Sequence, residues 1–410
     1  MTASTGPALG PAPIVVFGSF AEYDWGLLRQ RQQNMVDWLC EANERVIYVE
    51  RMGATIPSPA GAAKAIGRRL RRTGARERGL SSVGGLPPEN LRFVRCPIVP
   101  LHGVGFFDEL NAGVLLARLE RLVAPFDLCE CAAFVFYPSP YVLASVKRAG
   151  FKLLVHDAAH RYATVPSVYG VRAGWVDREI ARLADVASCD SRALCDDRRL
   201  DGVECLRIPQ GVDTAAWLAD EGDGDGVLAA LESIAASGPV AGFVGALSDV
   251  VDAALMSAFA EGFPGSVVFV GPTLSPPLGR LSDAVIRLGA VDARSVPAVM
   301  RRLDVGLIPY RMSQRTEAVL PTKLVEYLAS GCRVVSTPLP EVVALQDEYP
   351  NAVLTVPDVA SWRDLAASLD LSARLERGVS DAVLRAYAWP RILEPLARQI
   401  EVAWRGAGAA

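Results

Sequence analysis

The chain has 410 residues, a length that implies two domains and leaves room for a third. Hydrophobic residues make up 51% of it, enough for a large core, and a net charge of −4 gives no electrostatic reason to expect nucleic acid binding. The sequence shows no apolar signal core and no apolar run of about 18 residues, so we expect a cytoplasmic protein with at most peripheral membrane contact.

The first half of the chain alternates between predicted strands and helices. Residues 14–17 (IVVF) indicate a strand, residues 25–42 an amphipathic helix and residues 45–50 a second strand, which together make a βαβ unit and predict a parallel sheet. The later predicted elements are strands at 91–94, 97–99, 132–137, 152–156, 185–187 and 205–208, and helices at 110–122, 141–148, 174–183 and 191–199.

An acidic, glycine-rich stretch at 218–226 reads as a loop near a domain boundary, and a second series of elements follows it. The predicted strands of this series are 240–244, 266–270, 305–309, 333–336 and 353–356, with an apolar stretch at 284–288 and helices at 249–260, 295–302, after 321 and from 359 onward. We therefore predict an α/β protein of two Rossmann-like domains that face each other across a cleft: 1–213, completed by 390–410, and 214–389.

Lys323 and Glu326 carry the strongest chemical signal. Pro321 fits a helix start, and free N–H groups in the first turn, near Thr322, favour an anion. Lys323 adds a positive charge, and Glu326, on the same helix face, could accept hydrogen bonds from vicinal ribose hydroxyls. On spacing alone, a surface ion pair between the two side chains explains the pattern equally well.

Open α/β sheets bind ligands beyond the carboxyl ends of their strands. In the second domain this rule selects the loops that begin with Gly245-Ala246, Gly271-Pro272 and Gly289, together with the loop 310–322. In the first domain it selects Gly18-Ser19 and the pair His156-Asp157, for which a polar structural role fits as well as a role at a sugar. His160-Arg161 follows closely, and a solvated loop is its simplest explanation.

Metal sites have little support in the sequence. The chain has three His and eight Cys, and Cys129-x-Cys131 lacks a second pair at ligand spacing. Cys40, Cys189, Cys195 and Cys332 read as small buried hydrophobic residues. Asp223-Gly-Asp225 is a D-x-D pattern but follows no apolar strand, so we expect no metal cofactor. The basic stretch 68–78 fits a solvated excursion better than a lipid contact.

Several segments resemble bacterial GT-B glycosyltransferases, similar to glycosyltransferase family 4 and the group that makes teichuronic acid and other cell-surface sugars. The segment PTKLVEYLASGCRVVSTPLPEV resembles the family's P-x-K-x-x-E-Y-L-A-x-G-x-P-V-V-S-T pattern. LVHDAAHRY resembles V-V-Y-D-x-x-D-D-Y, IPQGVD resembles V-P-N-G-V-D, and AYAWPR fits the closing x-x-S-W, where the last helix returns to the first domain. The opening R-x-R-P-Q pattern is matched by Arg31 and Gln33, with Gln32 in place of Pro.

The resemblance implies a nucleoside diphosphate sugar as donor and a site built from both domains. The loop positions, the helix start and the resemblance together predict the donor-binding residues Gly245, Ala246, Gly271, Pro272, Val291, Arg311, Arg315, Thr322, Lys323 and Glu326. The implied catalytic residues are His156, Asp157 and Lys323, and the implied acceptor-binding residues are Gly18, Ser19, Trp25, Arg31, His160 and Arg161. Many relatives carry an Arg and a Lys after the first strand of the second domain, where this chain has Ser248, Asp249 and Asp252, so Arg311 or Arg315 would assist Lys323.

We therefore predict a metal-independent glycosyltransferase that acts on a small metabolite or a cell-surface glycan, and the family resemblance implies that it acts with retention. Its partners would be the nucleotide sugar and the acceptor. A sugar-nucleotide epimerase is the first alternative, although three His leave few groups for its chemistry. A non-catalytic protein of the same fold is the second, and the presence of both Lys323 and Glu326 argues against it.

Overall fold

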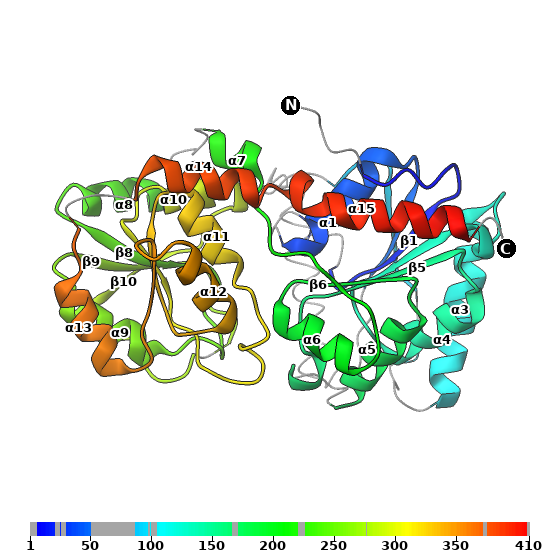
Figure 1. Ribbon diagram of the computed structural model, residues 1–410, viewed down its shortest axis with the longest axis horizontal. Helices are drawn as coiled ribbons and strands as arrows, with labels where there is room; N and C mark the ends of the chain where they lie inside the picture. Colours follow the sequence, from blue (N-terminus) through cyan, green and yellow to red (C-terminus); the bar gives the residue numbers. More distant parts are fainter. Residues whose placement is uncertain are drawn as a thin grey trace. The chain divides into compact units, whose positions relative to one another are not determined.

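The computed structural model describes residues 6–20, 25, 30–50, 87–96, 99, 105–165, 171–219, 226–275, 277–371 and 375–407. The chain forms two compact units (Figure 1). Unit 1 runs to Cys189 and adds Leu194–Arg207 and the end of the chain from Glu394, and unit 2 comprises Asp190–Ala193 and Ile208–Leu393. We predicted that the second domain spans residues 214–389 and that residues 390–410 belong to the first domain. The long segment of unit 2 is Ile208–Leu393, so each predicted boundary lies within a few residues of the observed one.

Unit 1 contains a parallel sheet of seven strands in the order β3-β2-β1-β4-β5-β6-β7. Its strands are β1 (Ile14–Phe17), β2 (Val46–Val49), β3 (Leu91–Val94), β4 (Ala132–Val135), β5 (Leu153–Ala158), β6 (Val186–Cys189) and β7 (Leu206–Arg207). Its helices are α1 (Arg31–Ala42), α3 (Gly105–Val123), α4 (Pro140–Ala149), α5 (Val171–Leu183) and α6 (Arg192–Leu200), with short 3₁₀ turns at Leu128–Glu130 and Tyr162–Thr164.

Unit 2 contains a second parallel sheet, of six strands, in the order β10-β9-β8-β11-β12-β13. Its strands are β8 (Val240–Val244), β9 (Ser266–Val270), β10 (Val285–Gly289), β11 (Val305–Ile308), β12 (Arg333–Ser336) and β13 (Val353–Thr355). Its helices are α7 (Thr214–Leu218), α8 (Gly226–Ala235), α9 (Ala253–Gly262), α10 (Val296–Met300), α11 (Thr322–Ala329), α12 (Pro340–Glu348), α13 (Val359–Ser368) and α14 (Arg377–Ala386), with a 3₁₀ turn at Ala293–Ser295.

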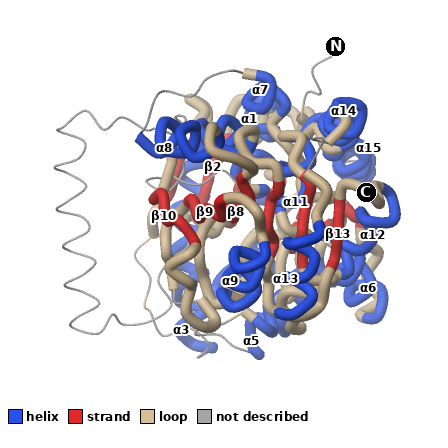
Figure 2. Tube along the Cα trace, turned by 90° about the vertical axis from the view of Figure 1, so that its left-hand side faces the viewer, coloured by secondary structure: helices blue, strands red, loops and turns tan. Residues whose placement is uncertain are grey.

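Helices cover both faces of the unit 2 sheet, which is why its central strands are apolar on both sides (Figure 2). One core joins the sheet to α8, α10, α11, α12 and α14. A separate core on the opposite face joins it to α9 and α13, where Phe259 and Trp362 pack edge to face. Both cores depend on the buried strands, so the carboxyl ends of those strands have fixed positions.

The last helix, α15 (Trp389–Gly406), begins in unit 2 and continues in unit 1 from Glu394, with Pro395 inside it. In unit 2, the indole of Trp389 packs so close to Gly211 that a Cβ there would lie 2.6 Å from Trp389 Cδ2. In unit 1, the ammonium of Lys152 lies 4.1 Å from the ring of Trp404. Among the helices described, none is long and apolar enough to cross a membrane.

Candidate active site

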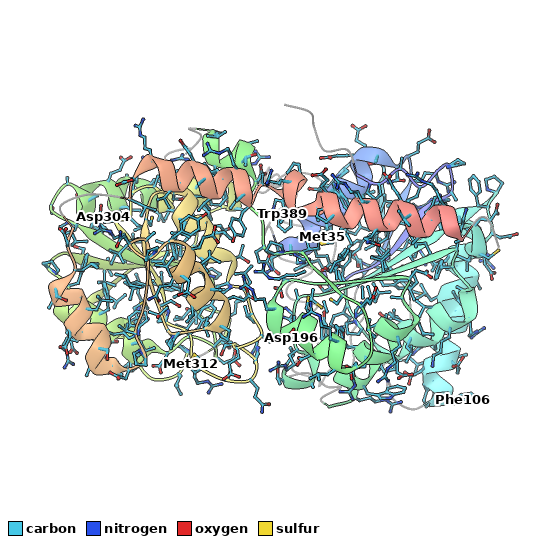
Figure 3. All side chains as sticks on the ribbon, viewed as in Figure 1. Met35, Phe106, Asp196, Asp304, Met312 and Trp389 are labelled. Atoms are coloured by element: carbon cyan, nitrogen blue, oxygen red, sulfur yellow. The ribbon has the colours of Figure 1, made fainter. Side chains whose placement is uncertain are left out.

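The loops that the sequence selected in unit 2 leave the same edge of the sheet, because every strand pair in it is parallel. Figure 3 labels Asp304, which directly precedes β11, and Met312, which lies in the loop after that strand. The strand order places a change of direction between β8 and β11. Ligands of open α/β sheets bind at such a point, beyond the carboxyl ends of the strands.

Tyr327 fills the space where β8 and β11 separate. The two strands pair at only two positions, Val305 with Ala241 and Gly306 with Gly242. Beyond them the buried Tyr327 hydroxyl accepts a hydrogen bond from the Val244 N–H (2.8 Å) and donates one to the Gly242 carbonyl (3.2 Å). Its ring packs against Gly306, where a Cβ would lie 2.3 Å from the ring. These contacts fix α11 at the point where the strands separate.

The first turn of α11 has no side-chain cap. Pro321 is its N-cap residue and Thr322 its first helical residue, as the sequence predicted. Among the described residues no side chain caps this turn, so the Thr322 and Lys323 N–H groups and the partial positive charge of the helix end are available to an anion.

Lys323 presents a cation beside this helix end. Its ammonium lies 3.4 Å from the Tyr310 hydroxyl and 5.2 Å from the centre of the buried Phe243 ring. It also lies against Gly245, where a Cβ would be 2.6 Å from Nζ. Within the described ranges no carboxylate comes within ion-pair distance of Lys323. A partly buried cation without a carboxylate is suited to an anionic ligand.

Glu326 lies one helical turn further along α11 and is partly buried. Burial raises the pKa of its carboxyl to about 7, although the Lys323 charge opposes that shift. Among the residues that the structure describes, its carboxyl has no hydrogen-bond or ion-pair partner. The surface ion pair that spacing alone allowed is therefore not formed, and the two side chains are both available to a ligand.

The glycines after β8 and β9 bring two backbones together. Gly245 and Gly271 have φ values of +138° and +148°, and a Cβ on Gly271 would lie 2.1 Å from the Gly245 carbonyl oxygen. The Gly245 N–H bonds to the Val270 carbonyl (2.8 Å). Ala246 is partly buried in the same loop, Pro272 is exposed, and Val291 is partly buried after β10. The predicted donor-binding backbone segments thus lie on adjacent strands of one edge.

The two arginines expected to assist Lys323 differ in their surroundings. Arg315 Nη1 lies 3.2 Å from an Asp249 carboxylate oxygen. This ion pair neutralises much of the charge that Arg315 would offer to a diphosphate. Arg311 is exposed, and its guanidinium forms no hydrogen bond or ion pair with a described residue, while its carbonyl accepts a bond from the Thr316 hydroxyl. Of the two arginines, Arg311 is therefore the one whose positive charge is available to a ligand.

In unit 1, β5 extends to Ala158, so His156 and Asp157 lie inside the strand and are buried, instead of following it. His156 Nδ1 bonds to the Val135 carbonyl and Nε2 to an Asp177 carboxylate oxygen, both at 2.8 Å. Each of these partners can only accept, so satisfying both takes a ring with two N–H groups. A contact between His156 and a sugar would first require one of these bonds to break.

Asp177 links His156 to Arg198. Arg198 donates to the second carboxylate oxygen of Asp177 (2.7 Å), and all three side chains are buried. Burial alone would raise the pKa of Asp177, but the hydrogen bond from His156 and the charges of His156 and Arg198 hold it below its usual value. These residues therefore form a buried charged network.

Asp157 and Arg31 form a second buried pair. Arg31 Nε and Nη2 donate to the two carboxylate oxygens of Asp157 at 2.9 and 2.7 Å, and the Ser188 hydroxyl donates to the same carboxylate at 2.6 Å. The structure thus gives Asp157 and Arg31 contacts within the fold, at the start of α1.

The acceptor-side residues near β1 belong partly to the core. Trp25 is 1% exposed and packs edge to face on Tyr48 and Phe93, so it is a core aromatic side chain. Gly18 allows the Tyr48 ring to pass, since a Cβ would lie 2.0 Å from it, and Ser19 donates to Gln32 Oε1 (2.6 Å).

His160 and Arg161 follow β5 at the same edge of the unit 1 sheet. His160 is exposed and lies edge to face against the Tyr162 ring, whereas Arg161 forms a two-point ion pair with Asp197 on α6 at 2.8 and 3.1 Å. The D-x-D pattern at 223–225 and the basic stretch at 68–78 lie outside the described residues.

Sequence reasoning did not identify four residues that shape these sites. Tyr327 and Tyr310 position α11 and Lys323, while Tyr48 and Gln32 order the backbone after β1. Helical spacing predicts that Tyr327 is buried, but no sequence pattern predicts the hydrogen bonds of its hydroxyl group. The Gln32 amide nitrogen is buried and makes no hydrogen bond to any described atom.

Comparison with known proteins finds relatives of this sequence and of this fold. Residues 238–369 match the family model described as Glycosyl transferases group 1. Over 119 residues the chain is 35% identical to a protein of Bacillus subtilis (strain 168) named as the teichuronic acid biosynthesis glycosyltransferase TuaH. That match covers 27% of this chain and spans only 30% of the length of the curated relative.

Solved structures match over nearly the full chain. Sucrose-phosphate synthase from Thermosynechococcus elongatus is 14% identical with a TM-score of 0.64, and the match covers 97% of this chain and 99% of that one. Alr3699/HepE of Anabaena, solved with UDP and glucose, is 13% identical with a TM-score of 0.64, and the match covers 95% and 100%. The predicted architecture is confirmed, because the chain has the GT-B fold, and its residues 238–369, which contain Lys323 and Glu326, match the family model of the group 1 glycosyltransferases.

Proposed function

We propose that the protein transfers a sugar from a nucleoside diphosphate sugar to an acceptor, and that unit 2 holds the donor. The observation that carries this proposal is the pair Lys323 and Glu326 on α11, a cation and a carboxyl group one turn apart. Among the described residues, Lys323 contacts the Tyr310 hydroxyl but has no ion-pair partner, and the Glu326 carboxyl has neither a hydrogen-bond nor an ion-pair partner. Anionic phosphates and ribose hydroxyls are the complementary ligand groups.

Lys323 and the N–H groups of the first turn of α11 would stabilise the negative charge that develops on the leaving diphosphate. Glu326, as a carboxylate, would accept hydrogen bonds from the two ribose hydroxyls. Gly245 and Gly271 would let the backbone approach the diphosphate and the base. We propose that this arrangement requires no metal ion and that Arg311 assists Lys323.

Uridine is the base that we propose to test first. The relative from Anabaena was solved with UDP, with UDP and glucose, and with UDP-glucose, and its fold matches this chain over 95–97% of the residues. The acceptor, a small metabolite or a glycan, would be held by residues of unit 1. Retention at the anomeric carbon and a cytoplasmic site of action also belong to this proposal.

Isothermal titration calorimetry with UDP, GDP and dTDP tests the donor site. We expect one nucleotide to bind, and we expect Lys323→Met to weaken it by about 10- to 100-fold, because a hydrogen bond to a charged group contributes about 1.5–3 kcal/mol. The control is Lys147→Met, which removes an exposed lysine of unit 1. Failure of the unaltered protein to bind any of the three nucleotides would contradict the proposal.

Product analysis then separates the possible reactions. A glycosyltransferase releases the nucleoside diphosphate when it transfers the sugar to an acceptor or, by hydrolysis, to water. An epimerase changes the configuration of the sugar when the donor is the only substrate present. Activity that is unchanged by EDTA would support the metal-independent reaction. The configuration of the product at the anomeric carbon, read by NMR, would test retention.

A further inference from the structure

Three cysteines of unit 1 meet at one point, although they come from three different elements. Cys189 ends β6, Cys195 lies on α6, and Cys205 directly precedes β7. Cys205 Sγ is 3.1 Å from Cys189 Sγ and 3.5 Å from Cys195 Sγ, and all three sulfur atoms lie within 4.8 Å of one another. No other group of three His, Cys, Asp or Glu side chains in the described residues brings its ligand atoms together in this way.

These distances suit a shared metal ion. A Zn–S bond is about 2.3 Å long, so two thiolates on one tetrahedral ion lie about 3.8 Å apart. The Cys205–Cys195 and Cys205–Cys189 sulfur distances, 3.5 and 3.1 Å, are shorter than this, and side-chain rotations about χ1 can lengthen both. We propose that Cys189, Cys195 and Cys205 form a binding site for a thiophilic d¹⁰ ion, Zn²⁺ or Cu⁺.

Nearby charge favours this assignment. Arg198 and Arg199 lie on α6 with Cys195, and Arg207 lies in β7, directly after Cys205 and Leu206. Thiolates are the ligand form of cysteine, and neighbouring guanidinium groups stabilise them. Three thiolates and one divalent ion carry one net negative charge, which these arginines would offset.

The exposure of the three side chains differs in a way that also fits an ion. Cys189 and Cys195 are buried, at 0% and 3% exposure, whereas Cys205 is only partly buried. The site therefore has a closed inner side and an outer side that an ion can reach. Three protein ligands leave a fourth position of a tetrahedral ion for water or another small ligand.

An ion at this site would join β6, α6 and the start of β7. Arg198, the neighbour of the cysteines, also holds Asp177, and Asp177 holds His156. Ion binding would therefore stabilise the part of unit 1 that carries this buried charged network. The proposal does not depend on the proposed sugar transfer, because binding of the ion can be measured without activity.

The test uses the full chain, purified with a metal-free thiol-protecting reductant and stripped with a chelator. Zn²⁺, Co²⁺ and Cu⁺ are each titrated against a competing chromophoric chelator, and bound metal is counted by mass spectrometry. We expect one equivalent of ion per chain, a thiolate-to-metal charge-transfer band with Co²⁺, and a higher melting temperature with the ion than without it. Preference between Zn²⁺ and Cu⁺ decides which ion the site takes.

Two single variants locate the ion. Cys205→Ser should abolish stoichiometric binding, whereas Cys129→Ser removes an exposed thiol outside the cluster and should leave binding unchanged. Circular dichroism of both metal-free variants establishes that they fold. No tight binding by the reduced protein, or equal binding by the two variants, would overturn the proposal.

Discussion

The Lys323 ammonium lies against the backbone of Gly245, so close that a Cβ on Gly245 would stand 2.6 Å from Nζ and 2.3 Å from Cε. Gly245 directly follows β8, the first strand of unit 2, and Lys323 lies in the first turn of α11, the helix after β11. The absence of a side chain at position 245 thus determines where the predicted diphosphate-binding cation can lie.

Gly245→Ala should therefore weaken nucleotide binding through Lys323. The new methyl group would displace the ammonium, and we expect a loss of about tenfold or more in affinity, measured by calorimetry. Gly238→Ala is the matched control, because Gly238 also has a positive φ, +152°, but has no atom within 4 Å of the position of a Cβ. In a Lys323→Met background the Gly245→Ala effect should largely disappear; full additivity of the two changes would show that they act separately.

Glu326 should make nucleotide binding depend on pH. Its carboxyl has a pKa of about 7, and ribose hydroxyls donate best to the ionised form, so affinity for a nucleotide sugar should increase as pH rises from 6 to 8. The increase is limited to about tenfold, the ratio of the ionised fractions at these two pH values. The measurement should use the nucleotide sugar and not the free nucleoside diphosphate, because the terminal phosphate of the free nucleotide itself titrates in this pH range.

Glu326→Gln should give a flat pH profile over the same range. The pKa of Glu326 lies above the unfolded value of 4.5, so its ionisation costs the folded protein stability as pH rises from about 4.5 to about 7. The variant should lose this part of the pH dependence of unfolding. If the affinity of Glu326→Gln for the nucleotide sugar changes with pH as much as the affinity of the unaltered protein, Glu326 is not the titrating group.

The parallel strands were the most predictable part of the structure. The strands at 14–17, 91–94, 240–244, 266–270 and 333–336 match their predicted bounds, because short apolar runs between turns are typical of strands, and all of these except 91–94 are largely buried. Lys323 was recognisable from its place after Pro321 at a helix start. The sequence could not show that Lys323 and Glu326 form no ion pair, because two side chains three residues apart on a helix can pair or remain apart, depending on their surroundings.

Side-chain partners distant in sequence were beyond prediction. We predicted that the strand ends at His156, two residues before its end at Ala158, and therefore expected His156 and Asp157 to be exposed. In the structure both side chains are buried. Their partners Asp177 and Arg31 lie 21 and 126 positions away, and only the packed fold brings them together. Cys189, Cys195 and Cys205 converge for the same reason: their spacing fits no ligand motif, but β6, α6 and β7 are neighbours in space.

Tyr327→Phe should destabilise unit 2. The variant leaves the buried Val244 N–H without its 2.8 Å partner, which costs about 1–3 kcal/mol in the free energy of unfolding. Urea denaturation measures this loss. Gly306→Ala should cost more, because its methyl group would collide with the Tyr327 ring at 2.3 Å. A Tyr327→Phe variant as stable as the unaltered protein would mean that the hydroxyl contributes nothing to the position of α11.

Asp177→Asn should destabilise unit 1 at neutral pH by about 3–5 kcal/mol, because it leaves the buried Arg198 and His156 without their shared carboxylate. Asp196→Asn is the control: it removes an exposed partner of Arg199, and such surface pairs contribute about 0–1 kcal/mol.

The cost of Asp177→Asn should also diminish in acid. The pKa of Asp177 lies below its usual value of 3.8, so the carboxylate contributes stability above that pH and loses it as pH falls through its pKa in the folded protein. Urea unfolding of the variant and the unaltered protein at pH 7, 5 and 3 measures the difference. A cost that stays constant over this range would show that packing, and not the charge of Asp177, maintains the network around His156.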